Sequence, residues 1–158
     1  MIFKNNKGLT LVELLLTLAI SLSIMVLVSS MLFQSFRSKE ISDTHVNLRQ
    51  EANLILSMFS SAQVSGAGTT FDISYQRINA KEWELKIGNQ EIVNPSYDIS
   101  LEMVVGSNTA SIIIDPRTIQ QISMTINKKQ KLNIKSLTLI DKKDTNNKFE
   151  ISSVISRL

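Results

Sequence analysis

The chain begins with one long apolar stretch and continues with shorter segments of regular periodicity. Residues 14–36 form a run of 23 residues without a charged side chain. An α-helix rises about 1.5 Å per residue, so this run would be about 34 Å long. The hydrocarbon core of a bilayer is about 30 Å thick, and buried helices of water-soluble proteins seldom stay uncharged for more than about 18 residues. The pattern therefore favours a membrane-spanning helix over a buried one.

Beyond the apolar run, a stripe of apolar residues indicates that the helix continues. The stripe recurs in alternating steps of four and three, and consists of Ile41, His45, Leu48, Ala52, Ile55, Phe59 and Ala62. No proline interrupts residues 9–63, and Gly66 and Gly68 then mark an end. We expect an amphipathic continuation over residues 37–63 that packs on a folded domain rather than forming a free coiled coil. His45 is interpreted as a half-buried stripe member, not a ligand.

After the glycines, the periodicity changes from 3.6 to 2, which is typical of strands with one buried face. Short alternating segments are separated by turn signals such as Gly88-Asn89 and Asp115-Pro116. The predicted strands lie near residues 71–75, 83–87, 91–93, 99–105, 112–114, 122–126, 134–140 and 149–155. Their even spacing favours an antiparallel sheet, one face of which would cover the helix stripe. The predicted fold class is α+β, with a β-rich domain over residues 64–158, although strand order cannot be derived.

The residues before the apolar run look like a leader peptide. Lys4 and Lys7 precede the run, so the positive-inside tendency places the N-terminus in the cytoplasm and the C-terminal domain outside it. An ordinary signal peptide would need small residues after the run, but Phe33-Gln34-Ser35-Phe36-Arg37 follows there. The small-residue break lies before the run, at Gly8. A leader of residues 1–8 and a membrane helix of residues 9–36 are therefore expected in a single-pass membrane protein.

The segment Gly8-Leu9-Thr10-Leu11-Val12-Glu13 resembles the processing motif of type IV prepilins and type II secretion pseudopilins. The resemblance implies that prepilin peptidase cuts between Gly8 and Leu9 and methylates the new amine. Leucine at the first mature position departs from the usual phenylalanine. The resemblance also implies other pilin subunits as partners. Many major pilins have a proline in the membrane helix and a C-terminal disulfide loop; neither occurs here, which favours a minor subunit, with a Gram-positive competence pilus as one setting.

Glu13 is the main candidate assembly residue. An ionisable group at the head of a membrane segment is costly and indicates a function. A freed amine at Leu9 would lie four residues away on the helix. In the resembled family, the matching carboxylate pairs with the N-terminal amine of a neighbouring subunit. The alternative is a carboxylate that is favoured by the helix dipole alone.

A polar stripe on the same helix supports packing against other helices. Thr10, Glu13, Thr17, Ser21 and Ser35 fall within an arc of about 80° on one helix. Small hydroxylated residues in membrane helices tend to face other helices, because the backbones can approach closely there. The competing interpretation is that these hydroxyls bond to carbonyls of their own helix.

Composition adds limits. The formal charge is +3, and removal of Lys4 and Lys7 with the leader would leave +1. The chain has no cysteine and one histidine, and it lacks a G-x-S-x-G, phosphate-loop or H-E-x-x-H motif. We therefore expect no enzyme activity, no cofactor and no small-molecule substrate. The turn at residues 141–147 is interpreted as solvated rather than as a calcium loop, because its oxygen ligands do not alternate and two lysines intrude.

A basic tract in the last third is the main rival signal. Residues 117–148 hold eight Lys or Arg and two Asp. The candidate polyanion-binding residues are Lys128, Lys129, Lys131, Lys135, Lys142 and Lys143. They would suit non-specific phosphate contacts to DNA, lipid headgroups or wall polymers. No aromatic residue lies between Tyr97 and Phe149, so base stacking has no platform, and solvated hairpin tips are the alternative.

Three hypotheses follow. The first is a structural minor subunit, inserted in the membrane, cleaved after Gly8 and assembled into a filament at the cell surface, for DNA uptake or protein secretion. The second is a tip-type subunit that holds DNA or another polyanion. The third is a membrane-anchored β-domain that keeps its leader and never polymerises.

Overall fold

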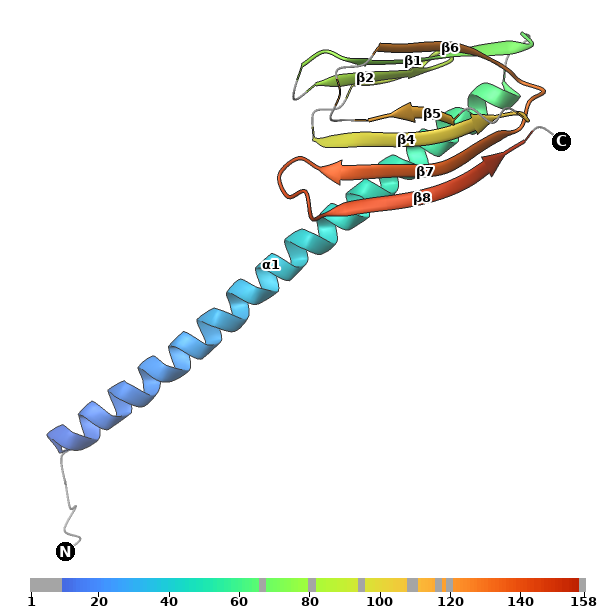
Figure 1. Cartoon of the computed structure of the whole chain (residues 1–158). Helices are drawn as coiled ribbons and strands as arrows, with labels where there is room; N and C mark the ends of the chain where they lie inside the picture. Colours follow the sequence, from blue (N-terminus) through green and yellow to red (C-terminus); the bar gives the residue numbers. More distant parts are fainter. Residues whose placement is uncertain are drawn as a thin grey trace, which may run out of the picture. The chain divides into compact units, whose positions relative to one another are not determined.

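A computed structural model describes residues 10–65, 68–79, 82–93, 96–107, 111–115, 118 and 121–156. The chain divides into two compact units, residues 1–41 and residues 42–158. The described parts hold one helix and eight strands (Figure 1).

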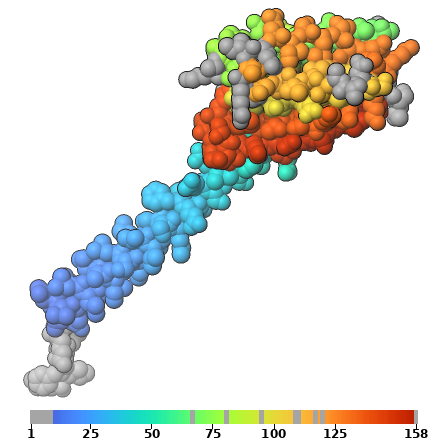
Figure 2. All heavy atoms as spheres, viewed as in Figure 1, coloured from blue at the N-terminus to red at the C-terminus, as the bar shows by residue number. Residues whose placement is uncertain are grey.

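Helix α1, Leu11–Val64, runs through the end of the first unit and the start of the second. The predicted helix is confirmed as one uninterrupted element, and it ends two residues before Gly66, which lies outside the described residues. Over residues 11–36, every large apolar side chain is exposed. Figure 2 shows these side chains (blue) uncovered on the face in view. By length and composition, α1 is the one helix of the described part that could cross a membrane.

All eight predicted strand segments of the second unit are strands. Their bounds are β1 Thr70–Arg77, β2 Trp83–Ile87, β3 Gln90–Val93, β4 Tyr97–Val105, β5 Ser111–Ile114, β6 Gln121–Asn127, β7 Leu132–Asp141 and β8 Lys148–Ile155. They pair antiparallel throughout, as predicted. Instead of the one expected sheet they form two, ordered β3-β2-β1-β6 (the first sheet) and β5-β4-β7-β8 (the second sheet). The two sheets are separate because β6 pairs with β1 and not with β5.

The core of the second unit lies between α1 and the inner faces of the two sheets. From the helix, Leu48, Ala52, Ile55 and Phe59 are buried, which confirms that part of the predicted stripe. The strands contribute alternating residues: Phe71, Ile73, Tyr75, Trp83, Leu85, Ile87, Tyr97, Ile99, Leu101, Met103, Leu132, Ile134, Leu137 and Leu139. The prediction for His45 is wrong, because this side chain is exposed. Periodicity shows which face of a helix is apolar but not at which residue the covering domain begins.

Polar contacts fix the helix and the two sheets against one another within the second unit. The Tyr97 hydroxyl donates to Glu51 Oε2 at 3.1 Å, which joins β4 to α1. Trp83 Nε1 donates to the Tyr97 carbonyl at 2.7 Å, which joins β2 of the first sheet to β4 of the second. The Arg49 guanidinium lies 5.6 Å from the centroid of the Phe149 ring, within cation–π range. Fully buried aromatic residues thus occupy the seam between the sheets.

Candidate functional site

Glu13 and Thr10 form a capping box at the start of α1. The backbone N–H and the hydroxyl of Thr10 both donate to Glu13 Oε2 at 3.0 Å. In return, the backbone N–H of Glu13 donates to the Thr10 hydroxyl oxygen at 3.3 Å, and the N–H of Leu14 donates to the Thr10 carbonyl at 3.1 Å. Thr10 is therefore the N-cap residue and Glu13 the third residue of the helix. The T-x-x-E spacing is the sequence signal for such a box, although from the sequence Thr10 was expected only on a helix face.

The other residues of the candidate assembly stripe are placed as follows. Thr17 is exposed, and its hydroxyl donates to the carbonyl of Leu14 at 2.9 Å. This contact is the intrahelical alternative that the sequence left open for such hydroxyls. Ser21 is exposed on α1. The predicted processing residues Gly8 and Leu9 lie outside the described residues.

The candidate polyanion-binding lysines do not form one surface. Lys128 is 4% exposed, and its ammonium group donates to the carbonyl of Ser65. This side chain is therefore engaged in a contact within the second unit. Lys129 and Lys131 are exposed in the connection between β6 and β7. Lys142 and Lys143 follow the far end of β7, a strand of ten residues, which at about 3.3 Å per residue is about 33 Å long.

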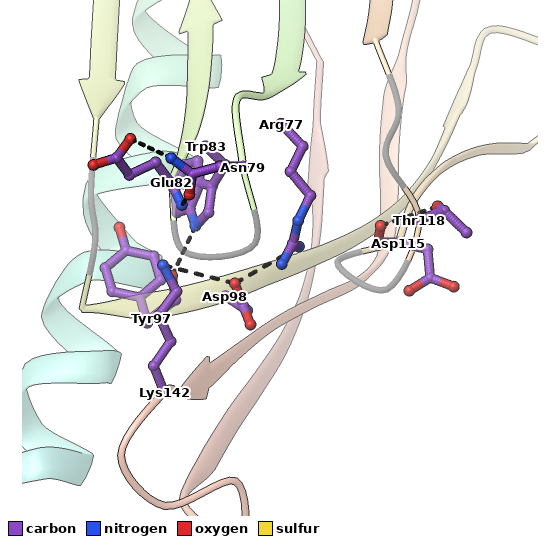
Figure 3. A network of polar contacts seen from close by, with 9 residues as sticks. All are labelled: Arg77, Asn79, Glu82, Trp83, Tyr97, Asp98, Asp115, Thr118 and Lys142. Carbon is purple, nitrogen blue, oxygen red and sulfur yellow. Dashed lines mark hydrogen bonds and ion pairs between the residues drawn. The ribbon is translucent and has the colours of Figure 1, made fainter.

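Two members of the basic tract, Lys135 and Lys142, have acidic neighbours. Lys135 Nζ lies 2.9 Å from Glu102 Oε1. Lys142 Nζ lies 3.8 Å from Asp98 Oδ1, which is also 3.8 Å from Arg77 Nη1 (Figure 3). Sequence counting gave a local charge excess, but it could not show that strand pairing would place carboxylates opposite these lysines. No observation in the described part favours DNA binding.

The Arg77–Asp98–Lys142 cluster lies where three elements meet. Arg77 ends β1, Asp98 is on β4 and Lys142 follows β7, so the cluster joins the two sheets (Figure 3). Burial lowers the pKa of the Lys142 ammonium, against the opposing effect of Asp98. Burial also raises the pKa of the fully buried Tyr75 phenol, while the neighbouring Arg77 guanidinium opposes this shift. This cluster could not be predicted from the sequence, because its members are 21 residues or more apart.

The turn at residues 141–147 is held by its own acidic side chains. Asp141 Oδ1 accepts the backbone N–H of Lys143 at 2.9 Å, and Asp144 Oδ1 accepts that of Asn146 at 3.0 Å. The N–H of Asn147 donates to the Asp144 carbonyl at 2.9 Å. These are turn-forming contacts of the kind that aspartate commonly makes.

The class of molecule follows from the long helix and its first turn. The described part combines a helix that is long and apolar enough to cross a membrane, a carboxylate in the first turn of that helix and an antiparallel β-domain. This combination fits a membrane-anchored protein. A family model described as the prokaryotic N-terminal methylation motif matches residues 3–32. This match supports the prepilin-type pilin and pseudopilin family, and it implies interaction with prepilin peptidase and with other pilins. No curated protein and no solved structure matches the chain.

Proposed function

We propose that this chain is a filament subunit that is cleaved between Gly8 and Leu9 and assembled into a type IV pilus or pseudopilus. The observation that carries the proposal is the methylation motif over residues 3–32, which overlaps an apolar helix whose large apolar side chains are exposed over residues 11–36. Such a surface needs lipid or other helices around it. The N-terminus lies in the cytoplasm and the β-domain outside it.

Glu13 gives assembly a specific contact. Two hydrogen bonds from Thr10 use only part of the capacity of its carboxylate, which has about four lone-pair sites. A carboxylate in the membrane is unfavourable, although less so at the head of the segment, where Glu13 lies, than at the bilayer centre. Pairing with the N-terminal amine of an adjacent subunit would offset part of this penalty while Thr10 keeps the side chain in place. Correct register between subunits then depends on one charge pair.

The chain fits a minor subunit in this scheme. Its membrane helix has no proline and its domain has no cysteine, unlike many major pilins. Competence and protein secretion are the two settings proposed for it. Both would use the same first 36 residues and differ in what the β-domain contacts.

Mass spectrometry of the N-terminus tests the processing step. In cells that contain prepilin peptidase, the mature chain should begin at Leu9 with a methylated amine. A Gly8→Ala or Gly8→Phe variant separates sequence-specific cleavage from general proteolysis, because the bulky residue should block the cut more strongly. An intact Met1 in such cells would leave the chain as a membrane-anchored β-domain and contradict the proposal.

A further inference from the structure

Three ionic side chains meet at the end of the second unit where β1 ends and β4 begins. Asp98 Oδ1 lies 3.8 Å from Arg77 Nη1 and 3.8 Å from Lys142 Nζ, so one carboxylate oxygen faces two cations (Figure 3). The three residues come from β4, from the last position of β1 and from the turn that follows β7. The two cations therefore lie within twice that distance of one another, and Asp98 is the group that joins them.

The cations of this cluster are poorly solvated. The side chains of Arg77 and Lys142 are only 10% and 16% exposed, whereas that of Asp98 is 27% exposed. Asp98 Oδ1 is itself buried and has no hydrogen-bond partner among the described residues. Burial lowers the pKa of the Lys142 ammonium, Asp98 opposes this shift, and Arg77 adds to it. A charged Lys142 in this position therefore depends on an ionised Asp98.

Three further titratable side chains surround the cluster, one from β1 and one each from the positions that flank β2 and β5: Tyr75, Glu82 and Asp115. Tyr75 is uncharged at neutral pH, because burial raises the pKa of its phenol. Glu82 attracts the Lys142 ammonium less strongly than Asp98 does. The Glu82 carboxylate also accepts a hydrogen bond from the Asn79 amide at 2.7 Å. Asp98 is thus the main counterion of Lys142.

Lys142 attaches the β7–β8 turn, residues 142–147, to β4. Besides the ion pair with Asp98, its backbone N–H donates to the carbonyl of Ser96, directly before β4, at 3.3 Å. Two aspartates accept backbone N–H groups inside the turn, so the turn has a shape of its own. Arg77, in contrast, is fixed in the ladder between β1 and β2. A change in the cluster would therefore move the turn rather than the strand.

We propose that Asp98 is an acid-sensitive latch: its carboxylate holds the β7–β8 turn against β4, and its protonation releases the turn. A neutral Asp98 leaves two cations close together with little water around them. Loss of the ionised partner from a poorly solvated ion pair is unfavourable, because the remaining charge is uncompensated. Arg77 stays charged, since a guanidinium does not deprotonate in proteins. Lys142 can rotate its side chain into water, and the turn moves with it. The latch lies within the second unit and does not depend on the proposed assembly.

A nitroxide spin label in the turn tests the latch on the full chain in detergent micelles. The chain has no cysteine, so Thr145→Cys provides a single attachment site at an exposed residue of the turn. Asn89→Cys places the label in the exposed turn between β2 and β3, where it reports on unfolding of the unit as a whole. Spectra are recorded from about pH 7 to about pH 3, the range in which carboxylates bind protons, and again after return to neutral pH.

The label at Thr145 should become severalfold more mobile as the pH falls, and the change should be reversible. The label at Asn89 should not respond. Asp98→Asn has nearly the same shape but no charge, and it should give the mobile spectrum at both ends of the pH range. Lys142→Met leaves Asp98 with one cation, so it should give the immobile spectrum at both ends.

Other carboxylates bind protons in the same range, so neutral variants of them are the matched controls. Glu82→Gln, and Asp141→Asn combined with Asp144→Asn, should keep the acid response, because their amide oxygens still accept the hydrogen bonds of the turn and of Asn79.

The proposal is wrong if wild type does not respond, if Asp98→Asn responds like wild type, or if a control variant loses the response. Simultaneous release of both labels in wild type would show acid unfolding of the unit and no latch. If Asp98→Asn does not fold, which the label at Asn89 would reveal, Lys142→Met decides: an undiminished acid response in that variant would exclude the latch, and loss of the response would support it.

Discussion

The ammonium group of Lys128 donates a hydrogen bond to the carbonyl of Ser65, one residue beyond the end of α1. The contact satisfies a helix C-terminal carbonyl and places a positive charge at the negative end of the helix dipole. Gln63 adds to it by donating to the carbonyl of Gln130 at 2.8 Å. The connection between β6 and β7 thus closes over the last turn of α1.

We expect Lys128→Met to destabilise the β-domain. Methionine retains most of the apolar stem, but the hydrogen bond to the carbonyl of Ser65 is lost. Because Ser65 is exposed and its carbonyl can turn to water, the expected cost is about 0.5–1.5 kcal/mol. Denaturant unfolding of the full chain in detergent micelles, followed through the fluorescence of Trp83, measures the change. Lys129→Met is the control, since its side chain is exposed. Equal stabilities for the two variants would show that the Lys128 contact contributes nothing.

Glu13→Gln should separate charge from capping. Glutamine can still close the capping box, because its amide oxygen accepts the Thr10 hydrogen bonds. The variant should insert, be cleaved and remain helical, but it should incorporate poorly into filaments because it cannot neutralise a neighbouring amine. Subunit content of sheared filaments, compared with the membrane fraction, is the measurement. Wild-type incorporation would exclude the charge pair as the basis of assembly.

Thr10→Ala tests the other half of the capping box. Loss of the hydroxyl removes both a donor to Glu13 and the acceptor for its backbone N–H. The loss of an N-cap typically costs about 1 kcal/mol of helix stability. We expect faster amide exchange confined to the first turn of α1 and a milder assembly defect than in Glu13→Gln. Thr10→Ser, which keeps the hydroxyl, should behave as wild type.

The alkaline stability of the second unit should depend on Tyr75. Burial raises the pKa of this phenol above its ordinary value of 10.0, so the folded state holds the proton more tightly than the unfolded state. Its contribution is present below about pH 10 and is lost as the pH rises through the folded-state pKa. Tyr75→Phe should therefore lose less stability than wild type between neutral pH and pH values above 10.

The pKa of Lys142 is shifted as well. The effect of Tyr75 is therefore measured as the difference in stability between wild type and Tyr75→Phe. The lowered pKa of Lys142 means that the folded state holds its proton less tightly, so deprotonation of this group adds stability as the pH rises toward 10.5. Wild type and Tyr75→Phe share that contribution, and subtraction removes it. Parallel stability curves above pH 10 would contradict the role assigned to Tyr75.

Much of the fold could be predicted because it depends on local periodicity. The uninterrupted helix, its end near Gly66 and all eight strand segments follow from apolar spacing and turn residues. Pairing could not be predicted, because the same alternating pattern in β6 suits β1 or β5 equally well. His45 shows the same limit, since its place on a stripe does not reveal whether a domain covers it.

The candidate site divides in a similar way. The carboxylate at Glu13 could be identified from sequence, since a charge at the head of an apolar run stands out. Its hydrogen bonds with Thr10 could also be predicted from the sequence, because T-x-x-E is the spacing of a capping box. Lys128 was not, because charge counting treats every lysine as solvated, and only the return of β6 along β1 brings this side chain to Ser65.

The contact between Gln63 and Gln130 joins residues 67 positions apart. During synthesis, this contact can form only after the helix has been complete for some time. Synthesis proceeds from the N-terminus, so α1 is complete while the strands that cover Leu48, Ala52 and Phe59 do not yet exist. Contacts of such long sequence separation form late, and apolar surface exposed in the interval invites aggregation. A nascent chain therefore needs shielding, by lipid or by a chaperone, until β7 has emerged.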